Sequence, residues 1–194
     1  DYTRPALLKF FLPARDSHAA AYYDWGSEKE TEWKENYKLW MKFINEYKNR
    51  GGRVTAGADS GYMYNLYGFG YVQELELLRE AGFHPMEVIQ SATLNSAEAI
   101  GMEKEIGTIE VGKFADMILM DENPLKNLKY LYATGDIKLD DNNNIVRVGG
   151  VKYTIKDGII YDSKQLLKDV KKIVDEEKES TPGWEKLLFE SIGN

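Results

Sequence analysis

Hydrophobic residues recur along residues 27–50 at helical spacing, with lysine and glutamate between them. This pattern predicts a long amphipathic helix. We expect its apolar stripe to pack against a core, because such stripes are more often packing surfaces than cofactor sites; the stripe comprises Trp33, Tyr37, Trp40, Met41, Ile44 and Tyr47. Gly51 and Gly52 then end the helix and permit the turn into a short apolar strand, Val54 to Ala58.

Three further helices are predicted before residue 102. Two cover about residues 72–81 and 85–93, with Gly82 and Pro85 as their stop and start signals, and a third, short helix ends at Gly101. Near the beginning of the chain, the apolar run 6–12 is interpreted as a barrel strand or a strand-like entry.

The pattern changes to strands from about residue 106. Residues 114–120 are predicted as a buried strand, and residues 151–161 as a hairpin that turns at Asp157-Gly158. A final helix is expected over residues 163–179. A helix break at 180–184 and a loosely held tail follow it.

Asp59 stands directly after the predicted strand Val54 to Ala58, between Gly57 and Gly61. In parallel α/β architectures, catalytic and metal-binding groups gather at the C-terminal ends of strands, and flanking glycines let a ligand approach the backbone. A short carboxylate at this place also caps the following turn for purely local reasons. Taken alone, the segment favours the local interpretation.

Three more segments follow Asp59 in a fixed order. They are Glu80-Ala81-Gly82, the Pro85 helix ending in Ala92-Thr93-Leu94-Asn95-Ser96-Ala97, and the stretch from Ile106-Gly107 to Gly112-Lys113-Phe114-Ala115-Asp116. This ordered series resembles the C-terminal part of the metal-dependent amidohydrolase superfamily, from about residue 53 to 124 and more loosely to 163. Several spaced motifs in the right order are more specific than any one of them.

The resemblance implies an α/β fold: the C-terminal part of a (β/α)8 TIM-type barrel plus a small composite β-domain. Residues 1–105 would supply the last barrel strands and helices, 106–162 a β-domain segment, and 163–194 a C-terminal helix and tail. Asp59 then matches the family aspartate that binds a divalent metal ion and takes a proton from the attacking water. Many relatives have threonine before this aspartate, and Ala58 in this chain lacks that hydroxyl.

The resemblance also implies one or two metal ions, with zinc expected, whose other ligands are missing here. The family uses a His-x-His pair, a bridging lysine or a glutamate, and two later histidines, whereas this chain has two histidines and no cysteine. His84 precedes Pro85, where a structural helix cap is favoured. For His18, in a mixed polar loop, a surface position is favoured over one lining a substrate cleft.

Length supports the same expectation. A complete barrel needs roughly 250 residues, and this chain has 194 and begins at Asp1. We therefore expect a C-terminal portion that is inactive alone and whose first partner is the missing N-terminal part of the same protein. The remaining metal ligands are expected there.

Composition narrows the other partners. A net charge of −7 and a pI near 5.0 argue against nucleic acid. No apolar run reaches the roughly 18 residues of a membrane span, and no signal peptide is visible. The absence of cysteine excludes disulfides but fits a cytoplasmic protein as well as an exported one, so the localisation stays undecided. Homo-oligomerisation also stays open.

Two segments have alternative interpretations. The tyrosine-rich stretch Tyr62 to Tyr71 is either an aromatic loop over the active site or a packing element. The stretch Asp140 to Asn144 suggests a calcium loop but lacks the EF-hand spacing and closing glutamate, so a solvated turn is favoured.

Together these observations predict a metal-dependent hydrolase of a C–N bond in a small molecule: an amide, N-acyl amino acid, dipeptide or cyclic amide. A non-catalytic pseudoenzyme or interaction module on the same scaffold is the alternative. A related lyase or deaminase is a third. Asp59 is the residue expected to carry the chemistry.

Overall fold

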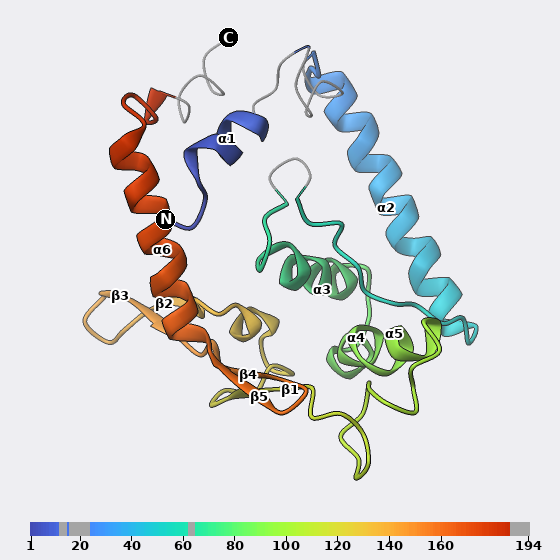
Figure 1. The fold of residues 1–194 in the computed structure, drawn as a ribbon. Coiled ribbons are helices and arrows are strands. Elements are labelled where there is room, and N and C mark those ends of the chain that lie inside the picture. Colours follow the sequence, from blue (N-terminus) through green and yellow to red (C-terminus); the bar gives the residue numbers. More distant parts are fainter. Residues whose placement is uncertain (12–14, 16–23, 62–64, 187–194) are drawn as a thin grey trace.

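The computed structural model describes residues 1–11, 15, 24–61 and 65–186. Helices α2 and α6 stand at opposite sides of the molecule with α3 between them, and the strands lie beside the end of α6 (Figure 1). The helices are α1 (Pro5–Phe11), α2 (Ser27–Asn49), α3 (Gly70–Glu80), α4 (Pro85–Ala92), α5 (Leu94–Ala99), the 3-10 helix η2 (Leu128–Leu131) and α6 (Ser163–Ser180). The strands are β1 (Met117–Met120), β2 (Asp136–Leu139), β3 (Ile145–Val148), β4 (Val151–Lys156) and β5 (Ile159–Asp162).

The strands form two antiparallel sheets, one of order β1-β4-β5 and the hairpin β2-β3. The predicted β4-β5 hairpin is confirmed. Asp157 and Gly158 have φ of 49° and 78°, the left-handed pair that twists a two-residue turn to match its strands. The stretch at Asp140 to Asn144 is the β2-β3 turn, with the Asp140 carboxylate accepting from backbone N–H groups of Asn142 and Asn144. This supports the solvated-turn interpretation.

The buried strand predicted at 114–120 is wrong in extent and in burial. Only Met117–Met120 form β1, and Ile118 and Leu119 are 45% and 47% exposed. Ile118 and Leu119 point to opposite faces of the sheet, so neither face of β1 is fully covered by the described residues. An apolar run does not by itself say whether a second layer covers the strand.

The predicted long helix is confirmed as α2, and Gly51 follows it with φ 86°. The prediction that its stripe packs in a core is wrong for most of its length, since α2 has no buried residue and Trp40 is 54% exposed. Only Met41 and Ile44 pack against the core. Helix α2 lies along one side of the molecule (Figure 1), and in its first turns Trp33 stacks on Trp25 instead of packing in the core.

The strand predicted at 6–12 is also wrong, because Pro5 to Phe11 form helix α1. Proline is well placed in a first helical turn, where its missing N–H leaves no bond unmade. The carboxylate of Glu177, on α6, accepts from the Ala6 N–H at 3.1 Å and pairs with Arg4. A negative group at a helix N-terminus stabilises the helix.

The strand predicted at Val54 to Ala58 is wrong as a sheet element. These residues run without helix or strand assignment, and the strands within the described ranges are all antiparallel. The backbone of this segment bonds to α4 and α5 instead. The remaining helices α3, α4, α5 and α6 confirm the predictions to within about two residues at each end. The domain boundaries at residues 105 and 162 stay predictions.

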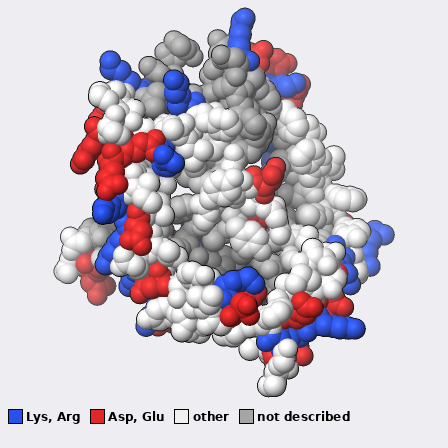
Figure 2. All heavy atoms as spheres, viewed as in Figure 1, with Lys and Arg blue, Asp and Glu red and all other residues white. Residues whose placement is uncertain are grey.

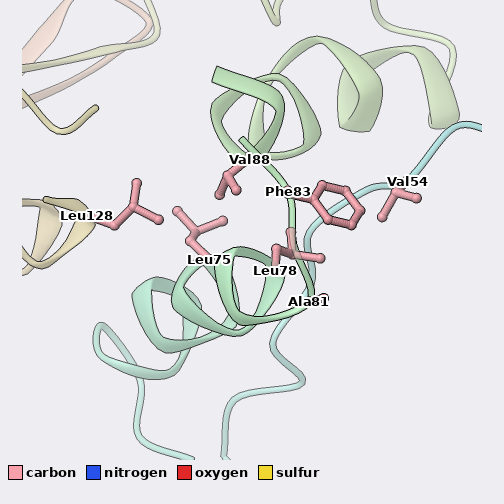
Figure 3. Packing of buried hydrophobic residues seen from close by; sticks show 7 residues of the cluster. All are labelled: Val54, Leu75, Leu78, Ala81, Phe83, Val88 and Leu128. Carbon is pink, nitrogen blue, oxygen red and sulfur yellow. The ribbon is translucent and has the colours of Figure 1, made fainter. Parts of the chain in front are cut away.

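One hydrophobic cluster joins the segment before Asp59 to the helices (Figure 3). Phe83, which is 0% exposed, lies beside Val54, and Leu75 of α3 faces Leu128 of η2. The cluster consists of Val54, Leu75, Leu78, Ala81, Phe83, Val88 and Leu128. Burying a Leu or Phe side chain stabilises a fold by roughly 1.5–3 kcal/mol, so this cluster fixes where the Asp59 segment begins.

No helix in the described ranges is long and apolar enough to cross a membrane.

Candidate active-site turn

Asp59 ends the extended segment and opens a turn, as its flanking glycines suggested. Its φ of 46° is left-handed, a region that aspartate tolerates better than most residues. The side chain is exposed, and no hydrogen bond or ion pair engages its carboxylate within residues 1–11, 15, 24–61 and 65–186. The local capping interpretation therefore has no bond to support it, and the carboxylate is available to a ligand.

Helices α4 and α5 hold the segment before Asp59 through its main chain. Asn95 Nδ2 donates to the Val54 carbonyl at 2.8 Å, and the Ala56 N–H donates to the Ser91 carbonyl at 3.2 Å. Arg53 adds an ion pair to Glu98 at 3.0 Å. Asn95 belongs to the motif Ala92 to Ala97. Sequence reasoning used that motif for recognition only and missed that its asparagine replaces a neighbouring strand as hydrogen-bond partner.

The motif after Ile106 packs on the same helix. A Cβ added at Gly107 would lie 2.6 Å from the Cβ of Ala97, so only glycine permits this contact. Lys113 Nζ donates to the carbonyl of Glu103, which precedes the motif, at 2.6 Å and so closes the loop 103–113. These contacts connect α5 to the loop that leads into the β1 sheet.

Asp116 has a structural role in the β-sheet region. Its Oδ2 accepts from Lys156 Nζ at 2.5 Å, and its Oδ1 accepts from the Asp157 N–H at 2.7 Å. The Lys156 hydrogen bond is the main cause that holds the pKa of Asp116 below its usual value, and the Asp157 bond adds to it. Asp116 thus ties β1 to the β4-β5 turn. Asp121 makes a longer ion pair to Lys152, at 3.7 Å.

The tyrosine-rich segment divides between its two interpretations. Residues 62–64 lie outside the described residues. Tyr71 is a packing residue, since its hydroxyl donates to the Ala92 carbonyl at 3.2 Å, and burial together with Glu74 raises its pKa. Tyr67 is exposed, and its ring lies against Gly61 in the Asp59 turn, where a Cβ would overlap it. An aromatic surface beside Asp59 therefore remains in the structure.

Glu74 on α3 is a further titratable group with an unusual setting. It is half-buried, and burial raises its pKa. Burial is the main cause that raises the pKa of Tyr37 and of Tyr71, and the negative charge of Glu74 adds to it. Sequence reasoning missed Glu74 because it stands in an ordinary helical run, Glu74-Leu75-Glu76-Leu77, whose pattern does not separate exposed from half-buried carboxylates.

The described residues do not form a metal site. In these ranges no group of three or more His, Cys, Asp or Glu side chains could hold an ion. His84 has the predicted structural role, as N-cap residue of α4 whose N–H donates to Glu87 Oε2 at 2.7 Å. His18 lies outside the described residues. Asp59 can thus be one ligand of a site, and the donor set around it does not fit a complete one.

Two clefts lie away from Asp59. One, of about 360 Å³, is lined mainly by apolar residues of α5, the 106–109 loop and β1, and by Asp116. The other, of about 250 Å³, lies between α3 and residues 125–128 and contains Glu76 and Arg79. Neither includes Asp59.

The sequence matches a known protein family over more than half of its length. The model described as the amidohydrolase family matches residues 40–160. The chain belongs to the amidohydrolase family. The resemblance inferred from the ordered motifs is thereby confirmed, and the matched residues contain Asp59 and all three later motifs.

Individual relatives cover a shorter part. An imidazolonepropionase from Shouchella clausii is 30% identical over 102 residues, 53% of this chain and 21% of that protein. A 5'-deoxyadenosine deaminase from Methanobrevibacter smithii is 33% identical over 121 residues, 57% of this chain and 26% of that protein. Among solved structures, a Xaa-Pro dipeptidase with methionine bound in the active site is 27% identical with a TM-score of 0.50, over 63% of this chain and 25% of that one.

The chain thus spans about a quarter of the length of these relatives. The amidohydrolase family generally uses divalent metal ions and acts on C–N bonds. Its solved members imply a TIM-barrel-type fold, while the described residues of this chain form an α/β structure with small antiparallel sheets.

Proposed function

We propose that this chain is the C-terminal part of a metal-dependent hydrolase that cleaves a C–N bond in a small molecule. Amides, N-acyl amino acids, dipeptides and cyclic amides are the substrate classes. The observation that carries the proposal is the exposed Asp59 carboxylate, which has no partner in the described part of the chain and is presented at the end of an anchored segment. The family match over residues 40–160 supports the reaction class.

Asp59 has two tasks in this proposal. Its carboxylate is one ligand of a divalent ion, proposed as zinc, with the remaining ligands supplied outside the described residues. When bound, such an ion lowers the pKa of water toward neutrality. Asp59 itself accepts the proton of the attacking water and returns it to the leaving amine, a task that needs a carboxylate within hydrogen-bond reach of both.

The aromatic face of α2 supports a larger protein around this chain. Trp33, Tyr37, Trp40 and Phe43 are all exposed, Phe43 at 70%. Exposed apolar patches of this kind mark surfaces that another segment covers. Figure 2 shows uncharged residues around the centre of this side of the molecule and charged ones mostly toward its edge. We propose that the N-terminal part of the same protein covers the α2 face and completes the barrel.

Substitution of Asp59 tests the proposal in the complete protein. Asp59→Asn keeps the size and one acceptor oxygen but cannot collect a proton, so kcat should fall on the order of 10² to 10⁴-fold. The melting temperature should change little, because the side chain has no partner among the described residues. Turnover would be measured on a panel of N-acyl amino acids, dipeptides and cyclic amides, together with metal content.

Asp116→Asn is the matched control. It removes an ionised hydrogen-bond acceptor that holds the β4-β5 turn, so it should lower stability and leave kcat unchanged. Near-normal turnover in Asp59→Asn with metal still bound would overturn the assignment. If the unmodified complete protein contains no metal and hydrolyses none of these substrates, the result would instead favour the non-catalytic module.

A further inference from the structure

Asn65 forms hydrogen bonds to the residues on both sides of Asp59. Its Nδ2 donates to the carbonyl of Ala58, the residue before Asp59. Its Oδ1 accepts from Ser60 Oγ at 3.4 Å, and its backbone carbonyl accepts from the Gly61 N–H at 2.7 Å. The residues on both sides of Asp59 are therefore held by one asparagine, while the Asp59 side chain itself stays unbound.

Gly70 provides the space in which the Asn65 amide lies. It is the buried first residue of α3, and a Cβ there would overlap Asn65 Oδ1 and lie 2.8 Å from Ser60 Oγ. Glycine weakens a helix by about 1 kcal/mol relative to alanine, and its φ is not left-handed here. The close approach of the amide is the physical reason for glycine at this position.

The contacts of Asn65 and Gly70 connect the Asp59 turn to the hydrophobic core through helix α3. Gly70 begins α3, and Leu75 and Leu78 of the same helix are buried in the hydrophobic cluster. Asn65 thus joins a helix fixed by packing to a turn in which Asp59 is exposed while Ala58, Ser60 and Gly61 are partly buried. A left-handed φ costs roughly 1–2 kcal/mol for most residues with a Cβ and less for aspartate, so the hydrogen bonds from Asn65 help to hold the φ of 46° at Asp59.

We propose that Asn65 is a positioning residue for the Asp59 carboxylate, and that Gly70 is required because it admits the Asn65 amide. The inference rests on the proposed role of Asp59 in hydrolysis. Asn65 touches neither substrate nor metal. It sets where the Asp59 side chain projects, and misplacing a catalytic group by about 1 Å costs on the order of 10²-fold in rate.

Three variants of the complete protein test this, each assayed for kcat, KM, metal content and melting temperature. Asn65→Asp keeps the side-chain volume, replaces the donor to Ala58 by a carboxylate oxygen and adds a negative charge to the turn. Asn65→Ala removes the whole amide, and Gly70→Ala leaves Asn65 in the sequence but takes its space. Each should lower kcat roughly 10 to 10²-fold per folded, metal-loaded molecule, with KM changed less than threefold.

The kcat of the double variant Asn65→Ala/Gly70→Ala separates the positioning role from a merely structural one. Without the amide the added Cβ loses its main clash, so the double variant should have about the kcat of Asn65→Ala alone. Multiplied losses would overturn the proposal. In an Asp59→Asn background, Asn65→Ala should lower kcat no further.

The two failures are distinguishable. Normal turnover in Asp59→Asn overturns both the proposed function and the positioning role. Loss of turnover in Asp59→Asn, with unchanged kcat per folded molecule in Asn65→Asp and Gly70→Ala, overturns the positioning role alone. These two variants also keep the test decisive if Asn65→Ala does not fold.

Discussion

The bond from Asn95 to the Val54 carbonyl should hold the extended segment on α5, and its removal can be followed at one amide. Asn95→Ala deletes the donor at 2.8 Å and leaves the carbonyl of a buried residue unpaired. A net hydrogen bond is worth about 1 kcal/mol, and a buried polar group left unpaired costs about 1–3 kcal/mol. Local opening of the segment should therefore become easier by about 1–3 kcal/mol.

The Ala56 N–H reports this opening, because it donates to the Ser91 carbonyl from the same segment. At about 1.4 kcal/mol per factor of ten, its hydrogen-exchange protection should fall roughly 5 to 150-fold in Asn95→Ala. Asn95→Asp, which keeps the size but has no donor, should lose at least as much.

Asn142→Ala is the control, since Asn142 lies exposed in the β2-β3 turn. Surface substitutions of this kind change stability by no more than about 0.5 kcal/mol, and Ala56 exchange should stay unchanged. Equal Ala56 protection in Asn95→Ala and the unmodified protein would refute the reasoning. The helix motif would then not hold the segment that leads to Asp59.

Three other outcomes are expected. Phe83→Ala should lower the free energy of unfolding in urea by about 3–5 kcal/mol, because Phe83 is fully buried, whereas the half-exposed Phe114→Ala should cost much less. Since Lys156 and the Asp157 N–H hold the pKa of Asp116 below its usual 3.8, Asp116 stabilises the fold above about pH 4 and loses this effect as pH falls through its folded pKa. The stability gap between the protein and Asp116→Asn should thus be present at pH 7 and shrink at pH 3, and a constant gap would contradict it. Calorimetry should show weak zinc binding by the 194-residue chain alone, as one carboxylate cannot replace a multi-ligand site, and tight stoichiometric binding would mean that ligands were missed.

Local signals in the sequence determined where several helices end and where the β4-β5 hairpin turns. Pro85 and Gly101 bound helices α4 and α5 where predicted, and Asp157-Gly158 makes the predicted hairpin turn. These features can be predicted from the sequence because proline restricts, and glycine widens, the range of backbone dihedral angles whatever surrounds them. The ordered motifs likewise identified the family from the chain alone.

Asp59 shows where that knowledge ends. The sequence predicted it at the C-terminal end of a strand and between glycines, whereas the structure places it at the end of a segment that has no strand assignment. Its surroundings came from tertiary contacts, since Asn95 lies 41 residues beyond its partner Val54, and Gly70 acts by what it lacks. No local pattern reports that an asparagine will donate to a distant carbonyl.

The same distinction explains the predictions that were wrong. The run 6–12 was read as strand, but Glu177, 171 residues beyond Ala6, binds the N-terminus of α1. The apolar stripe of α2 is predicted to pack in a core, but the side chains of its first half are exposed. Their burial would depend on which element packs against that face of the helix. Periodicity specifies which residues share a face of an element, whereas burial and pairing depend on what packs against that face, so only the tertiary structure decided them.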